Sequence, residues 1–148
     1  MKRVLLAFAC VSAAGSVGAG ARTQPVLPSL ATRADCGDLL ARAGRKPQGL
    51  IFEGCAYLPD RQGKPIRATY RVAGAHAAAV ETYLVRAARL GRLRRSCCQW
   101  DGRGGQFTVR GRDYLVSMSS EETSVASRRD WGKIDRFGVV VETFTEEI

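Results

Sequence analysis

The sequence has 148 residues, and its 23 basic against 14 acidic residues give a net charge of +9. This length fits one domain, and no stretch after the N-terminus is long and apolar enough for a membrane anchor, so no membrane insertion is expected. The excess of positive charge indicates either an arginine-rich solvated surface, which is the simpler interpretation, or an anionic partner.

The first 21 residues have the three parts of a secretory signal peptide. They begin with basic residues, continue with an apolar run from Val4 to Val11 and end with small residues. Lipidation of Cys10 is a weaker alternative, because a leucine-like residue is expected three positions earlier and Ala7 stands there. We therefore predict that residues 1–21 are cleaved and that the mature protein is periplasmic or secreted.

The next segments change from irregular to periodic. Residues 22–34 contain two prolines and no clear period, which predicts a flexible linker. Asp35 is a favourable N-cap, and apolar residues recur at helical spacing from Cys36 to Ala43, which predicts a short helix. Two alternating segments, 50–58 and 66–72, are separated by a turn rich in proline and glycine and predict a β-hairpin.

The longest helical pattern runs from Ala75 to Leu90, with one apolar face and an end at Gly91. The segment 121–135 is polar and predicts a loop, in which Trp131 either turns back into the core, the preferred interpretation, or is exposed for contact with a partner. This order of elements predicts an α+β domain at 35–148, in which an antiparallel sheet of about five strands carries two helices on one face and is stapled by disulfides. The later strands are predicted at 93–100, 106–109, 114–118 and 136–144.

Four cysteines remain after the signal peptide, and in an exported chain we predict that Cys36, Cys55, Cys97 and Cys98 form disulfides. Neighbouring residues of a strand point to opposite faces, so Cys97 and Cys98 could join their strand to two different layers. A bond between these two would strain the peptide that links them. Each is therefore expected to pair with Cys36 or Cys55, and we slightly prefer Cys36–Cys97 with Cys55–Cys98.

Catalytic and metal chemistry find little support in the sequence. Thiol redox chemistry at the vicinal cysteines is an alternative to structural disulfides, but no C-x-x-C motif accompanies them. Metal ligands at paired spacings are lacking, and His76, the one histidine, has no serine or cysteine motif beside it. We predict a protein that is not an enzyme, without catalytic residues, metal or cofactor.

The densest basic run crosses the end of the long helix and the next strand. Cations near a helix C-terminus are favoured by its dipole, which explains part of the run without any function. The functional interpretation is an electropositive patch for an acidic partner. Aromatic residues do not alternate with the arginines, so nucleic-acid binding is not expected. The run consists of Arg86, Arg89, Arg92, Arg94 and Arg95.

A group of residues spread over most of the predicted domain carries a resemblance to known sequences. The group comprises Cys36, Leu39–Leu40, Lys46–Pro47, Phe52, Cys55, Ala68–Val72, Gly74, Val80–Glu81, Tyr83–Leu84, Cys97–Cys98 and Trp100. On these residues the chain resembles a family of small exported bacterial proteins described only as a domain of unknown function. The Cys-Cys-x-Trp element is the most specific part. The resemblance implies one compact domain and brings no activity or ligand with it.

These features favour an exported, non-enzymatic binding protein. Its most specific form is a periplasmic inhibitor or immunity protein that binds an acidic protein, such as a toxin or an envelope hydrolase. One alternative is a thiol-redox envelope protein that uses Cys97 and Cys98. Another is a binder of an anionic envelope polymer through the arginine run.

Overall fold

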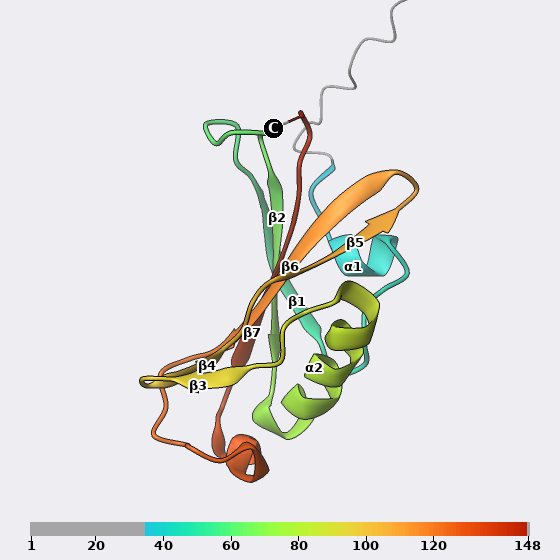
Figure 1. Ribbon diagram of the computed structural model, residues 1–148. Coiled ribbons are helices and arrows are strands. Elements are labelled where there is room, and N and C mark those ends of the chain that lie inside the picture. The colour runs from blue at the N-terminus through green and yellow to red at the C-terminus, as the bar shows by residue number, and fades with distance from the viewer. Residues whose placement is uncertain (1–34, 148) are drawn as a thin grey trace, which may run out of the picture.

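The computed structural model describes residues 35–147, so the predicted signal peptide (1–21) and linker (22–34) lie outside the described residues. Within this range an antiparallel sheet of seven strands is accompanied by three helices (Figure 1). The helices are α1 (Leu39–Arg42), α2 (Gly74–Ala88) and the 3-10 helix η2 (Arg128–Lys133). The strands are β1 (Ile51–Tyr57), β2 (Ile66–Val72), β3 (Arg94–Ser96), β4 (Gln99–Asp101), β5 (Gly105–Val109), β6 (Arg112–Ser120) and β7 (Phe137–Thr143).

The predicted α+β arrangement with an antiparallel sheet is confirmed, although the described part of the chain has more strands and helices than expected. The strand order is β1-β2-β7-β6-β4-β3, and β5 pairs with β6 off this path. The last strand, β7, lies between β2 and β6 and so completes the centre of the sheet. The hairpin of β1 and β2 and the long helix α2 occur where the sequence predicts them.

The core lies between one face of the sheet and α2. Strands β2, β6 and β7 alternate between buried and more exposed residues, as period-2 patterning requires. Helix α2 contributes Val80 and Leu84, both almost fully buried. On the same face the Tyr70 hydroxyl accepts a hydrogen bond from the backbone N–H of Leu40 and donates one to Asp38, which ties α1 to β2.

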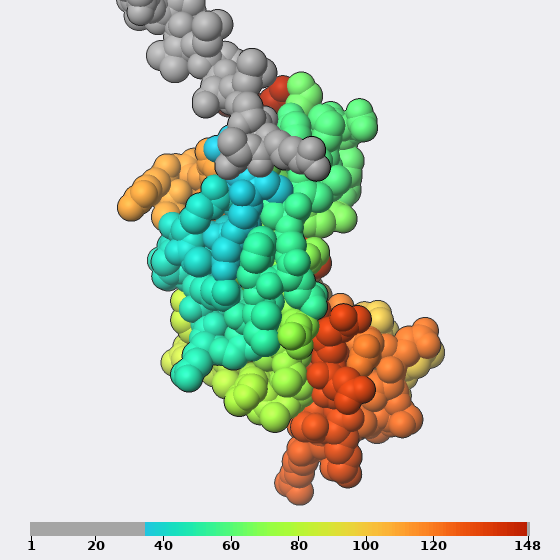
Figure 2. Space-filling view, turned by 180° about the vertical axis from the view of Figure 1, so that it is seen from behind, coloured from blue at the N-terminus to red at the C-terminus, as the bar shows by residue number. Residues whose placement is uncertain are grey.

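Two segments differ from the sequence-based expectation. The predicted strand 93–100 is a hairpin, because β3 and β4 pair with each other and leave Cys97 and Cys98 in the turn. The predicted loop 121–135 contains η2, and Trp131 in this helix is only 2% exposed, which confirms that it turns into the core. Figure 2 shows the opposite side of the molecule, where α1 and β1 form the upper surface and the η2 segment forms the lower end.

Among the helices between residues 35 and 147, none has the length and apolar character that crossing a membrane requires.

Candidate functional site

One disulfide is present in the described residues, and it joins Cys36 to Cys55 with a Cα–Cα distance of 5.6 Å. The expected pairing of these residues with Cys97 and Cys98 is therefore wrong. The reason lies in β1, where the register shifts between Phe52 and Gly54. This bulge places Phe52 opposite Tyr70 and brings Cys55 to the same inner face, where a regular period-2 strand would separate them.

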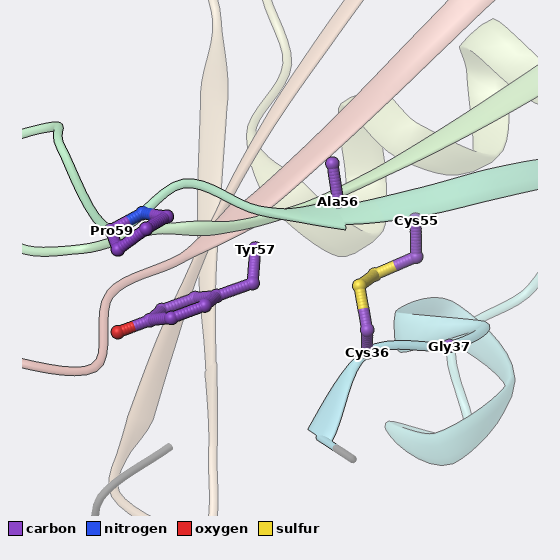
Figure 3. Close-up of a pocket in the computed structure, with 6 residues that line it drawn as sticks. All are labelled: Cys36, Gly37, Cys55, Ala56, Tyr57 and Pro59. Carbon is purple, nitrogen blue, oxygen red and sulfur yellow. A yellow bond between two sulfur atoms is a disulfide. The ribbon is translucent and has the colours of Figure 1, made fainter. Parts of the chain in front are cut away.

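A hollow of about 570 Å³ adjoins this disulfide (Figure 3). Its lining comes from the two cysteines and from Gly37, Ala56, Tyr57 and Pro59. No charged side chain is among them, and the Tyr57 hydroxyl is the only polar side-chain group. This hollow therefore offers little to orient a charged ligand.

Cys97 and Cys98 occupy the tip of the β3–β4 hairpin, and both are exposed free thiols. Their Sγ atoms lie 2.9 Å apart. The hydrogen bond with Cys97 is the largest cause that raises the pKa of the Cys98 thiol, and nearby Glu122 adds to it. Because Ser96 pairs with Gln99, the two cysteines are the two-residue loop of a hairpin and do not face two layers of the fold.

The structure separates the five arginines of the predicted patch. Arg92 lies 3.4 Å from Glu81 and Arg95 donates to the carbonyl oxygen of Val125, so both are engaged within the fold. Arg94 is exposed on β3, away from the end of α2. The remaining members of the patch, Arg86 and Arg89, belong to a different group of arginines.

We call this group the arginine site. It lines a hollow of about 740 Å³ next to the C-terminal end of α2, together with residues of β5 that include Phe107. All four side chains are exposed, and none has a carboxylate partner within residues 35–147. The arginine site consists of Arg45, Arg86, Arg89 and Arg103.

Glycines bring Arg103 to the helix end. The N–H of Gly91 donates to the carbonyl oxygen of Arg103 at 2.8 Å. A Cβ added to Gly105 would lie 2.2 Å from the carbonyl oxygen of Ala88, so only glycine permits this approach of β5 to α2. The contact holds the segment before β5 against the end of the helix and fixes Arg103 beside Arg86 and Arg89.

The end of α2 gives Arg89 an unusual conformation. The helix ends at Ala88, and Arg89 follows with a φ of 54°, in the left-handed region that helix ends usually assign to glycine. Gly91, where the sequence predicts the end, lies two residues further on. A non-glycine residue in this region is less stable by about 1–2 kcal/mol. Arg89 therefore makes the fold less stable than glycine would at this position, and its side chain places a positive charge at the hollow.

A buried carboxylate on α2, that of Glu81, binds the segments packed against this helix. Glu81 is fully buried and accepts hydrogen bonds from both terminal nitrogens of Arg128 at 2.7 and 2.8 Å, and from the backbone N–H of Leu93 at 2.7 Å. Burial acts to raise the pKa of Glu81, but the bonds from Arg128 and Leu93 outweigh it and lower that pKa. Arg128 also lies over the Trp131 ring at 4.5 Å, so the cluster joins α2, the segment just before β3, and η2.

Half of the arginine site is absent from the basic run that the sequence predicts as a patch. Arg45 follows α1 and Arg103 follows β4, and both stand far along the chain from Arg86 and Arg89. The glycines between Gly102 and Gly105 indicate that the backbone here lies close to another segment, but the sequence does not identify that segment. No group of three or more histidine, cysteine, aspartate or glutamate side chains within residues 35–147 could hold a metal ion.

The fold and these contacts define a disulfide-bonded α+β protein with an arginine-lined hollow. The chain belongs to the DUF4952 family, a domain of unknown function, whose family model matches residues 26–100. The match reaches Trp100 and so includes the residues on which the resemblance rests, but it ends before Arg103 and β5–β7. No curated protein and no solved structure matches the chain.

Proposed function

We propose that this chain is an exported, non-enzymatic binding protein whose arginine site receives acidic side chains of a partner protein. The observation that carries the proposal is the convergence on one hollow of four arginines from three separate segments, none of them paired with a carboxylate in residues 35–147. Guanidinium groups are planar and bind carboxylates through two parallel hydrogen bonds, which gives both attraction and orientation. An inhibitor or immunity protein that blocks a toxin or an envelope hydrolase is the most specific form of this function.

The electrostatic balance at the hollow favours an anion. The C-terminal end of α2 contributes about half a negative charge, and four arginines offset this several-fold. Arginine and aromatic residues are also typical of the centres of protein interfaces, and Phe107 lines the same hollow. The Cys36–Cys55 disulfide and the predicted signal peptide support an exported location.

A protein partner is favoured over a long anionic polymer because four arginines without a carboxylate partner in residues 35–147 line a single hollow. A polymer is bound best by a track of cations, whereas Arg92, Arg95 and Arg128 are engaged with groups of the fold itself. The binding experiment therefore includes an anionic polymer, and stronger binding of that polymer is the competing outcome.

The experiment compares a fluorescent octaglutamate peptide with an octaglutamine peptide and with a polyphosphate chain, by anisotropy at several salt concentrations. We expect octaglutamate alone to bind tightly, and each alanine substitution at Arg86 or Arg89 to weaken it about two- to fivefold, as for exposed ion pairs. Arg129→Ala is the matched control, because Arg129 is equally exposed and lies on η2. Equal weakening by the control variant, or stronger binding of polyphosphate, would contradict the proposal.

A further inference from the structure

The cysteine pair at the tip of the β3–β4 hairpin has no part in the arginine site or in the disulfide of the fold. Cys97 and Cys98 are adjacent, exposed and not joined by a disulfide, and their sulfur atoms lie 2.9 Å apart. A disulfide needs about 2.05 Å between sulfurs, so the bond forms when the two side chains move closer and the peptide between them takes up the strain of the ring. The hairpin projects at the side of the molecule, where a small reagent can reach it (Figure 1).

Hydrogen bonds with the segment 120–125 hold the hairpin in place. The backbone N–H of Thr123 donates to the carbonyl oxygen of Cys98 at 2.6 Å. Two residues later the indole N–H of Trp100 donates to Val125 at 3.0 Å, and the backbone N–H of Trp100 donates to Ser120 at 2.8 Å. The backbone of the turn is therefore anchored to the segment 120–125, and the two sulfurs lie 2.9 Å apart on it.

We propose that Cys97 and Cys98 form a reversible thiol–disulfide exchange site that reacts with small-molecule disulfides such as glutathione disulfide. The thiolate of Cys97 attacks one sulfur of the reagent, whose S–S bond breaks and releases one thiolate. Cys98 then loses its proton and attacks Sγ of Cys97, which forms the vicinal disulfide and releases the second thiolate. The two released thiolates take up the two protons, so two protein thiols are oxidised and one disulfide is reduced to two thiols.

The geometry makes this bond easy to reverse. Adjacent Cα atoms are about 3.8 Å apart, which is shorter than the 4.4–6.8 Å span of ordinary disulfides, so the vicinal bond is strained. Strained and exposed disulfides are the ones that small thiols reduce readily. The Cys36–Cys55 bond has a Cα–Cα distance of 5.6 Å, within the ordinary range, and is expected to persist under the same conditions.

The exchange is tested by equilibrating the purified protein in buffers that run from reduced glutathione to glutathione disulfide, followed by alkylation and peptide mass spectrometry. We expect both hairpin thiols to disappear together at the oxidising end and to return at the reducing end, while Cys36 and Cys55 stay bonded throughout. Wild-type protein should accumulate no glutathione adduct, because the neighbouring thiol displaces it.

Single substitutions show whether the two cysteines exchange disulfides as a pair or are merely accessible to the reagent. Cys98→Ser should retain a glutathione adduct on Cys97, because the displacing thiol is missing, and Gln99→Ala should behave as wild type. A vicinal bond that resists reduced glutathione, disulfide-linked dimers, or a stable adduct on the wild-type protein would overturn the proposal. The arginine site is independent, so Arg86→Ala should leave the exchange unchanged.

Discussion

Replacing Glu81 by glutamine tests the buried cluster that joins α2, the segment just before β3, and η2. The substitution keeps the shape of the side chain but removes its charge and turns one acceptor into a donor that faces Arg128. Losing one partner of a buried ion pair destabilises by about 3–5 kcal/mol. The Arg128 side chain is 39% exposed and can recover part of its hydration, so we expect a smaller loss than this, about 2–3 kcal/mol.

Thermal unfolding followed by circular dichroism measures this loss. A domain of this size loses about 4 °C of Tm for each kcal/mol, so Glu81→Gln should unfold about 8–12 °C below wild type. Glu53→Gln is the matched control, because the Glu53 carboxylate is 37% exposed and its pairs with Arg71 and Arg136 lie at the surface. An equal Tm for the two variants would refute the role assigned to the Glu81 cluster.

The Glu81 cluster should also make the stability of the folded protein depend on pH. The pKa of Glu81 is lowered from its ordinary value of 4.5, so its contribution to stability is complete above that value and is lost as the pH falls through the lowered pKa. The difference in Tm between wild type and Glu81→Gln should therefore be constant near neutral pH and shrink in acid. A difference that grows below pH 4.5 would contradict this sign.

Three further substitutions address the contacts around the arginine site and the disulfide. Gly105→Ala places a Cβ 2.2 Å from the carbonyl oxygen of Ala88 and should lose at least about 1–3 kcal/mol in urea unfolding; wild-type stability would show that the contact can relax. Arg89→Gly should gain about 1 kcal/mol yet bind octaglutamate more weakly, and a loss of stability would argue against strain there. Cys55→Ser opens a disulfide that spans 19 positions and should lose about 3 kcal/mol, measured with the same denaturant.

The elements with strong periodicity could be predicted from the sequence. Strand 66–72 alternates cleanly because it is central and has one buried face, and the helix near 75–90 has a continuous apolar stripe. Trp131 could be placed in the core because a large aromatic residue is rarely left in water. In these segments the local pattern and the tertiary environment favour the same conformation.

The cysteine pairing could not be predicted, because it depends on two local irregularities. The bulge after Phe52 changes the face on which Cys55 lies, and a period-2 pattern gives no sign of it. The turn at Cys97 and Cys98 lacks the glycine or asparagine that usually marks a two-residue hairpin. Without these signals a continuous strand is the natural interpretation.

The candidate site could be predicted only where its residues are close in sequence. Arg86 and Arg89 stand one helical turn apart, so a shared face follows from helix geometry. Arg45 and Arg103 reach the hollow through the packing of α1 and of the segment before β5, which no local pattern specifies. The burial of Glu81 beneath Arg128 is likewise a long-range contact.

The most direct measurement of the proposed function is an NMR titration of the purified protein with octaglutamate, in which the arginine Nε–Hε resonances are followed. We expect the largest shifts at the arginine site and at the backbone amides of Gly104 and Gly105, which line the same hollow. Arg67 and Arg71 already pair with carboxylates of the fold and should shift little. Shifts of equal size at these two arginines and at the arginine site would contradict a localised acidic-partner site.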